Sequence, residues 1–242
     1  MRLLGFIVFY IFVAANRVLA APGVTLNLGT GTEQTTLGVQ LIILLTILSV
    51  APAILLMTTS FVRFIIVFGM LRTALGLGQL PPTQVLIGLS LILTFVVMQP
   101  TFNAINDSAL QPYLERKIDE KTFFKSASSQ MRDFMLAQTP EDDLVVAARI
   151  MKIEEITTRD DIPFMVLIAS FMLSELKKSF QIGFMLFLPF IIIDMITASA
   201  LVSVGLMFLP PNTISLPFKI VLFILVDGWN LVSEGLLSGF NY

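Results

Sequence analysis

The chain has 242 residues, of which 56% are hydrophobic and only 13% are charged, whereas soluble domains carry about 25% charged residues. This much apolar surface cannot be hidden inside a water-soluble protein of this length, so several segments must face lipid or other protein. The absence of cysteine and histidine excludes disulfides, thiol and Ser–His catalysis and most zinc or haem ligation. The net charge of −2 provides no basic field for nucleic acid. We expect an integral membrane protein that is not an enzyme and holds no metal or cofactor.

Residues 1–20 have the three-part pattern of a cleavable signal peptide. Met1 and Arg2 are a basic start, an apolar stretch of 13 residues follows, and small residues lead to the expected cleavage between Ala20 and Ala21. The alternative is a first membrane-spanning helix, but 13 residues reach only about 20 Å, short of the hydrocarbon core of about 30 Å. Residues 21–36 then form a polar N-terminus of the mature chain.

Four later segments are apolar and long enough to span a membrane: residues 37–62, 84–105, 180–209 and 212–237. A fifth apolar segment, residues 164–173, is too short to cross alone. Its length suits a helix that packs on other protein.

Two similar corners connect these segments in pairs. A Leu-Pro-Pro sequence stands between the first two segments and again between the last two, with its prolines at Pro81, Pro82, Pro210 and Pro211. The first proline of each pair forces its predecessor out of the helical region, and the second can begin a new helix. The pattern predicts an all-α, membrane-associated fold with two helical hairpins, residues 37–105 and 163–242.

The residues between the hairpins, 106–162, are expected to form a helical region on the periplasmic side. Residues 107–161 carry eight Lys/Arg against twelve Asp/Glu, whereas positive residues favour the cytoplasmic side. Phe123 and Phe134 lie on one face of a predicted helix. The acidic residues at 141–143 suit the first turn of the next helix better than a calcium loop, because their spacing is wrong for calcium.

Four charged residues lie in or beside the apolar segments: Glu175, Asp194, Lys219 and Asp227. A charge at the bilayer centre costs about 2.5–3.5 kcal/mol on insertion scales, so such residues normally face protein or water. The favoured interpretation is structural, with the acids paired to lysines across helices or subunits. Glu175 and Lys219 are the favoured pair between subunits.

Two functional alternatives remain open for the same residues. Asp194 could be the relay of a small ion channel or secondary transporter. Asp194 and Asp227 could also share a proton as an intramembrane aspartyl protease does, although the Gly-x-Gly-Asp motif of such proteases is absent.

The last two apolar segments also contain many helix breakers. Lipid-facing helices tolerate such residues only where protein or a wet cavity satisfies the freed backbone groups. Together with the charges, this predicts an assembly of several subunits around an axis. The breakers are Gly183, Pro189, Gly205, Pro217, Gly228 and Gly235.

Two long sequence segments carry a family resemblance. Residues 170–184, SFMLSELKKSFQIGF, and residues 216–229, LPFKIVLFILVDGW, resemble the signature segments of the flagellar biosynthetic protein FliP family, which has counterparts in virulence type III secretion systems. Residues 60–76 and 81–89 are also typical of it, and the resemblance covers essentially the whole chain. Ser170 and Ser179 depart from it mildly, because the signature more often has alanine or glycine there.

The resemblance implies a core component of the flagellar type III export gate, in the bacterial inner membrane at the flagellar basal body. Several copies of the chain, about five, would assemble with FliQ, FliR and other export-apparatus membrane components. The helices would form a conical, helically arranged oligomer that conducts unfolded exported proteins and sits mostly above the membrane plane. The choice of flagellar over virulence use rests on the resemblance alone.

The family's narrowest constriction is a methionine-rich loop just before the second Pro-Pro corner. The matching residues are Leu206, Met207 and Phe208, of which one keeps the methionine. A narrow apolar ring can exclude water and ions by dewetting, and methionine adds flexibility. The resemblance therefore implies a pore collar at these residues, whereas the residues alone favour simple packing at a helix end.

Overall fold

The computed structural model describes residues 32–150, 162–206 and 208–240, which fall into two units, residues 1–51 and 52–242. The expected signal cleavage at Ala20 and Ala21, the signal peptide itself and Met207 therefore lie outside the described residues. The first unit contributes most of helix α2 (Thr32–Met57).

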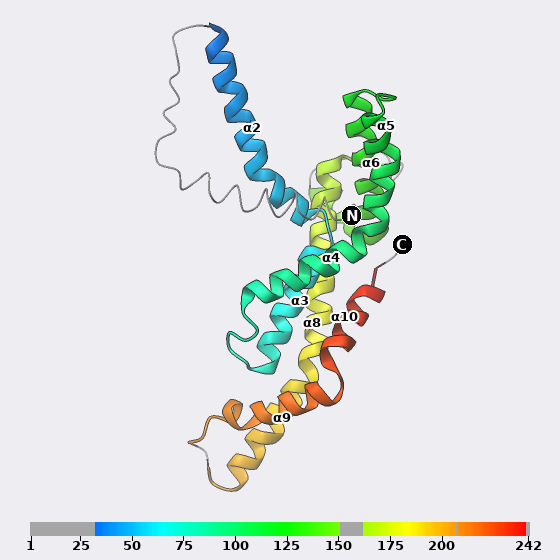
Figure 1. Ribbon diagram of the computed structural model, residues 1–242. Coiled ribbons are helices and arrows are strands. Elements are labelled where there is room, and N and C mark those ends of the chain that lie inside the picture. The colour runs from blue at the N-terminus through cyan, green and yellow to red at the C-terminus, as the bar shows by residue number, and fades with distance from the viewer. Residues whose placement is uncertain (1–31, 151–161, 207, 241–242) are drawn as a thin grey trace. The chain divides into compact units, whose positions relative to one another are not determined.

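The second unit consists of helices and turns, and the described residues contain no strand, which confirms the predicted all-α class. The order of its helices can be followed in Figure 1. They are α3 (Phe61–Leu75), α4 (Thr83–Ile105), a π-helical turn (Asn106–Leu110), α5 (Gln111–Leu114), α6 (Glu120–Gln138), α7 (Glu141–Ile150), α8 (Phe164–Ser203), α9 (Pro211–Leu225) and α10 (Gly228–Ser238).

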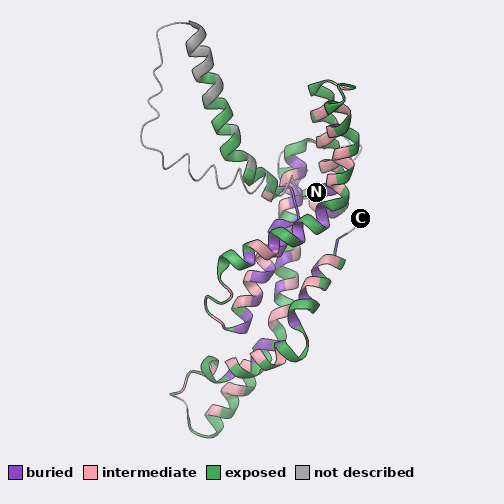
Figure 2. Ribbon diagram, viewed as in Figure 1, coloured by how far each residue is buried: buried purple, intermediate pink, exposed green. Residues whose placement is uncertain are grey.

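The core of this unit lies between α3 and α8, which run side by side (Figure 1). Phe64, Val67, Phe68 and Leu71 recur at helical spacing on α3 and are almost completely inaccessible to solvent. Their burial is the purple band along α3 in Figure 2. Residues with this spacing share one face of a helix, and burying that face stabilises the packing of α3 on α8.

Helix α3 corrects the first predicted segment, residues 37–62. Helix α2 ends at Met57 and α3 begins at Phe61, so the apolar stretch is two helices. The three residues between them all carry hydroxyl groups, and the hydroxyl of Thr58 donates a hydrogen bond to the carbonyl of Ile54 at 3.0 Å. Such side chains compete with the helical hydrogen bonds of the backbone. The residues expected to link two spans thus form a core helix.

Helix α8 corrects the prediction for residues 164–173 and 180–209. Both lie on one helix of 40 residues, Phe164–Ser203, because the polar residues between them are not helix breakers and Pro189 is accommodated within the helix. At 1.5 Å per residue this helix is about 60 Å long, about twice the hydrocarbon thickness of a bilayer. A membrane can therefore surround only part of α8.

The last predicted segment, residues 212–237, is also two helices. Helices α9 and α10 are bent by 62° at a break, where Asp227 has a left-handed backbone with φ of 49°, a conformation that short polar residues tolerate. The ring of Phe223 lies where a side chain on Gly228 would be, so this position has room only for glycine. By length and composition, two described helical stretches could cross a membrane, or up to four if each bent pair counts as one.

The region between the hairpins is helical over its described residues, as expected. Phe134 is buried and Phe123 half-buried on the shared face of α6, and the acidic residues 141–143 form the first turn of α7. Asp119 caps α6, and hydrogen bonds from Thr122 lower the pKa of this carboxyl below its ordinary 3.8. Because folding lowers this pKa, the cap makes its full contribution to stability at pH values above the ordinary pKa of 3.8. That contribution is lost as the pH falls through the lowered pKa.

Replacing Phe64 with alanine is expected to lower the free energy of unfolding by about 3–5 kcal/mol, because a fully buried ring leaves a cavity. Thermal unfolding of the purified protein in detergent measures the change. Phe124→Ala is the matched control, since this ring in α6 is exposed and its loss should change stability by less than about 0.5 kcal/mol. Equal shifts for the two variants would contradict the position of the core.

Candidate functional site

A buried ion pair joins α3 to α8. The Nε atom of Arg63 donates to Glu175 Oε2 at 2.7 Å, and its Nη2 atom donates to Oε1 at 2.5 Å. The two side chains are only 1% and 0% exposed. Two parallel charge-assisted hydrogen bonds fix both position and orientation, so this pair sets how the two core helices face each other.

The same arginine holds the end of the chain. Its Nη1 atom donates to the carbonyl oxygen of Gly239 at 3.0 Å, and the guanidinium lies 3.7 Å from the centre of the Phe240 ring. A cation over an aromatic face is attracted by the ring quadrupole. The Phe240 ring also packs against Phe64, with centroids 5.7 Å apart. Arg63 therefore ties the C-terminal end of α10 to α3 and α8.

Within the single chain Glu175 and Lys219 have other partners, and the expected pairing of these two residues between subunits stays a prediction. Glu175 is bound by Arg63, and Lys219 is bound by Asp194, so neither charge is left for the other within the chain. Arg63 was not among the charges expected to pair inside the apolar segments. The signal that could have identified it is chemical, because arginine is the cation best suited to a buried bidentate pair with a carboxylate.

A second ion pair connects α8 to α9. Lys219 Nζ donates to Asp194 Oδ2 at 2.6 Å and to the carbonyl oxygen of Ala74 at 3.1 Å. The hydroxyl of Ser215 donates to the other carboxylate oxygen, Oδ1, at 2.5 Å. The lysine is buried, and the aspartate side chain is 28% exposed. Both carboxylate oxygens are bound, in line with the structural interpretation of Asp194.

Asp227 is exposed in the single chain, so its expected burial or contact with another subunit stays a prediction. Its carboxylate accepts a hydrogen bond from Asn230 at 2.6 Å, while the carboxylate of Asp194 is held by Lys219 and Ser215. An aspartyl protease needs two carboxylates that share a proton. The two aspartates do not form such a pair here.

Two neighbouring lysines attach the region between the hairpins to α8. Lys177 Nζ lies 3.3 Å from Asp143 Oδ1 in α7, and Lys178 Nζ donates to the carbonyl oxygen of Gln138 at 2.5 Å, at the end of α6. The first contact is largely exposed and contributes little stability. The second satisfies one of the free carbonyl groups at a helix C-terminus.

Helices α4 and α9 begin at the two Leu-Pro-Pro sequences. Pro82 directly precedes α4, and Pro210 directly precedes α9, whose first residue is Pro211. At the first corner Arg72 Nη1 donates to the Thr83 hydroxyl at 3.1 Å and, at 3.4 Å, to the carbonyl of Pro81, which is half-buried. The sequence indicated the corners, but not the hydrogen bonds that Arg72 donates to the first of them.

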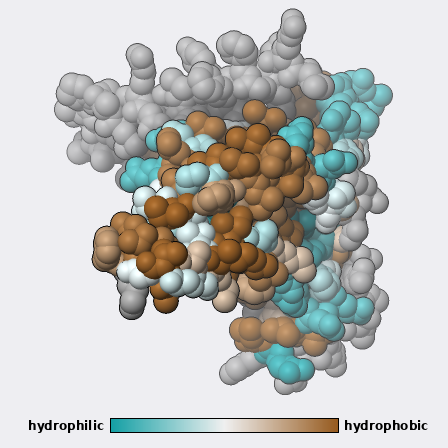
Figure 3. Space-filling model, turned by 90° about the horizontal axis from the view of Figure 1, so that it is seen from below, coloured by the Kyte–Doolittle hydropathy of each residue, from teal (hydrophilic) through white to brown (hydrophobic). Residues whose placement is uncertain are grey.

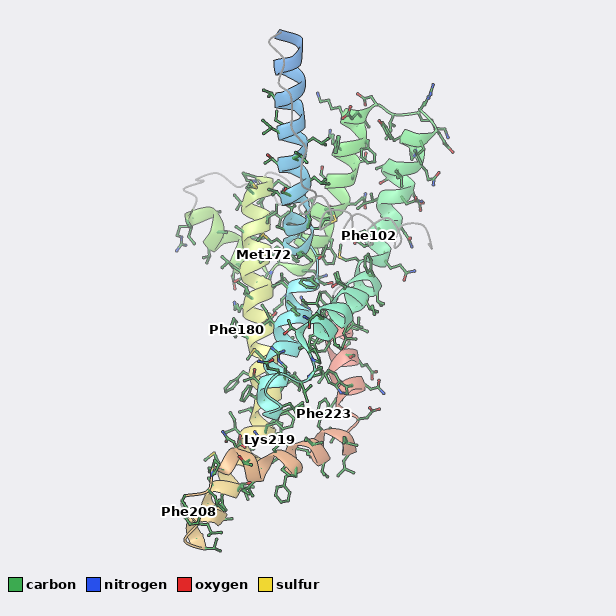
Figure 4. The ribbon with its side chains drawn as sticks, turned by 60° about the vertical axis from the view of Figure 1, so that its left-hand side comes forward. Phe102, Met172, Phe180, Phe208, Lys219 and Phe223 are labelled. Atoms are coloured by element: carbon green, nitrogen blue, oxygen red, sulfur yellow. The ribbon has the colours of Figure 1, made fainter. Side chains whose placement is uncertain are left out.

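Leu206 and Phe208, the described residues of the expected collar, lie at the end of the α8–α9 hairpin. Gly205 has a φ of 76°, which glycine adopts readily, and reverses the chain. Leu206 is 37% and Phe208 79% exposed. Figure 4 shows Phe208 at the far end of the hairpin and Lys219 farther from that end. The described collar side chains are thus available to contact other molecules.

Between the arms of this hairpin lies an open apolar groove of about 500 Å³. Hydrophobic side chains gather on the face of the molecule seen from this end in Figure 3. The groove means that α8 and α9 do not fill the space between them. Its lining residues are Ile193, Ile196, Thr197, Ala200, Leu201, Val204, Ile214 and Phe218.

The outer side of α8 is apolar and uncovered. Phe180, Phe184, Met185 and Ile192 are each more than half exposed, and Phe180 projects from the helix in Figure 4. Patches of this kind mark contact with lipid or with other protein. Within the described ranges no three acidic side chains come together as a metal site.

Comparison with known proteins gives one consistent result. The sequence model of the FliP family matches residues 44–236. A relative from Caulobacter vibrioides named flagellar biosynthetic protein FliP is 48% identical over 223 residues, which cover 92% of this chain and 84% of the relative. A protein of the same name from Pectobacterium carotovorum is 46% identical, and the match covers 98% of this chain and 92% of the relative. One from Bacillus subtilis is 47% identical, and the match covers 86% of this chain and 94% of the relative.

Glu175→Gln is expected to lower the free energy of unfolding by about 3–5 kcal/mol, because it leaves the Arg63 charge buried without a counter-charge. Thermal unfolding in detergent and the amount of protein that accumulates in the membrane measure the effect. Glu234→Gln makes the same chemical change at an exposed position in α10 and should behave like the parent. If both variants unfolded like the parent, the ion pair would not hold the core.

Proposed function

The chain belongs to the FliP family, and from this premise we propose that it is a core component of the flagellar type III export gate in the bacterial inner membrane. The family match and the relatives named flagellar biosynthetic protein FliP support this, and they agree with the resemblance of the signature segments. The relatives from Caulobacter, Pectobacterium and Bacillus all carry the flagellar name, which favours flagellar over virulence use.

The gate is built from several copies of the chain with FliQ, FliR and other membrane components. The observation that carries this proposal is the combination of charges neutralised inside the chain with an apolar exterior. Arg63 with Glu175 and Asp194 with Lys219 leave the outer side of α8 almost uncharged. Since α8 is about 60 Å long, some of its exposed apolar side chains, which run from Phe164 to Val202, must lie outside any one bilayer. Neighbouring protein, arranged in a conical oligomer, would cover them.

The collar closes this gate. Leu206 and Phe208 are apolar and exposed at the end of a hairpin, where copies arranged around an axis would bring them together. A ring of such side chains excludes ions when narrow and yields when a polypeptide enters. The chain supplies the wall and the closure of the conduit, while other components supply energy and no chemical reaction takes place on this chain.

A small ion channel or transporter with Asp194 as relay is the second candidate. A relay group must exchange protons with water or a neighbouring acid. The structure instead gives both oxygens of Asp194 to Lys219 and Ser215, which favours a structural role.

Leu206→Gly combined with Phe208→Gly is expected to make cells leaky to ions and small solutes, because the collar loses its apolar side chains. In a strain that lacks its own copy of the gene, the parent chain should restore flagellar export without leak. Membrane permeability and secretion of flagellar proteins are measured together. Leu114→Ala with Phe124→Ala removes the same side-chain types from exposed positions elsewhere and serves as the control. An assembled gate that stayed tight with both glycines would remove the collar role.

The region of residues 106–162 is proposed to lie in the periplasm, with the Leu-Pro-Pro corners on the cytoplasmic side. Because the chain has no cysteine, a single introduced thiol reports its side unambiguously. Ser128→Cys and Gln79→Cys are at exposed positions in α6 and before the first corner. A membrane-impermeant maleimide should label the Ser128→Cys variant in cells with a permeable outer membrane, and the Gln79→Cys variant only after the inner membrane is opened. The reverse pattern would invert the proposed orientation.

A further inference from the structure

The Asp194–Lys219 pair lies at the neck of the α8–α9 hairpin, between the body of the unit and the collar. Asp194 is in α8 before the collar, and Lys219 is in α9 after it. The lysine also donates to the carbonyl oxygen of Ala74, near the end of α3. The neck is therefore tied both across the hairpin and to a core helix.

The hydrogen bonds at this neck are directional, and they involve both oxygens of the Asp194 carboxylate. Lys219 binds one carboxylate oxygen and Ser215 binds the other, at 2.6 and 2.5 Å. Ser215 is itself completely buried. Charged hydrogen bonds in a partly desolvated site are shorter and stronger than neutral ones, and their geometry allows one arrangement of the two helices at this level.

Beside the neck and toward the tip, an open apolar groove interrupts the packing of the two arms of the hairpin. The groove between them has a volume of about 500 Å³ and is lined by α8 residues such as Ala200 and Val204 and by α9 residues Ile214 and Phe218. Close-packed apolar side chains fix one another in position, whereas side chains along a gap lose those contacts. Apolar contact between the arms along this groove therefore fixes the tip less firmly than a filled interface would.

We propose that Asp194 and Lys219 are positioning residues for the collar, because their ion pair, anchored on Ala74, sets the place of the hairpin tip, which apolar contact along the groove fixes less firmly. The proposal rests on the collar function proposed above. It assigns to the pair a role in closing the conduit in addition to any role in folding. The pair acts on Leu206 and Phe208 through the two helical arms and touches neither.

Lys219→Met tests this role directly, because methionine keeps a long apolar side chain and removes both donated hydrogen bonds. Gates that contain this variant should leak ions although every collar side chain is intact. Lys219→Arg, which keeps the charge, should leak less than Lys219→Met. Lys177→Met removes a lysine of α8 that contacts Asp143 in α7, away from the neck, and should leave the gate tight.

A covalent link between α8 and α9 at the neck gives a test that does not depend on how well the Lys219→Met variant folds. The Ser215 and Asp194 side chains meet across the neck in a hydrogen bond of 2.5 Å, so cysteines at both positions can be bridged by a short bifunctional methanethiosulfonate, which is bound through two reducible disulfides. The chain has no other cysteine. In assembled gates the Asp194→Cys, Ser215→Cys variant should be tight when bridged in the oxidised state and leaky when reduced, and each single variant, which cannot be bridged, should respond to neither condition.

The outcomes separate this inference from the collar proposal. If the Leu206→Gly, Phe208→Gly gate leaks while the Lys219→Met gate is tight, or the double-cysteine gate leaks equally when oxidised and reduced, the positioning role is wrong and the collar stands. If the glycine variant is tight, the collar itself is wrong. An interchain disulfide on a non-reducing gel would also overturn the inference, because it would place the two residues in different copies.

Discussion

The bidentate pair of Arg63 and Glu175 is the interaction on which the rest of the structure depends. Each charge alone would be prohibitively costly in an apolar interior, so the two must stay together for α3 and α8 to pack. The geometry of the arginine leaves one nitrogen for the Gly239 carbonyl and one ring face for Phe240. One side chain thus fixes the two core helices and the end of the last helix.

Because its buried charges are paired within the chain, the protein can present an apolar surface to the other subunits of an assembly. Four charged side chains of the apolar helices are paired with one another, at Arg63–Glu175 and Asp194–Lys219. What remains outside is apolar and long, too long on α8 for lipid alone. A surface of that kind is suited to contact with sister molecules, and hairpins that end in exposed apolar side chains can then meet around a common axis.

The sequence was sufficient for some features and not for others. The all-α class, the corners at Pro81–Pro82 and Pro210–Pro211 and the family follow from composition, local backbone chemistry and long motifs, which are properties of contiguous residues. The predicted helix limits were wrong where they depend on backbone geometry, because hydropathy contains no information about backbone conformation. The break at Asp227 depends on a left-handed residue and on a ring over Gly228. The partner of Glu175 within the chain, Arg63, could not be predicted for a related reason, because this pairing is decided by how α3 and α8 pack.

The central claim is that the apolar exterior of this chain is covered by other protein around a conduit. The native mass of the complex, extracted from the inner membrane in mild detergent, tests it most directly. The account predicts one particle whose mass requires several copies of this chain together with further export-apparatus subunits. A particle that contains a single copy, with the outer side of α8 occupied only by detergent and lipid, would contradict it.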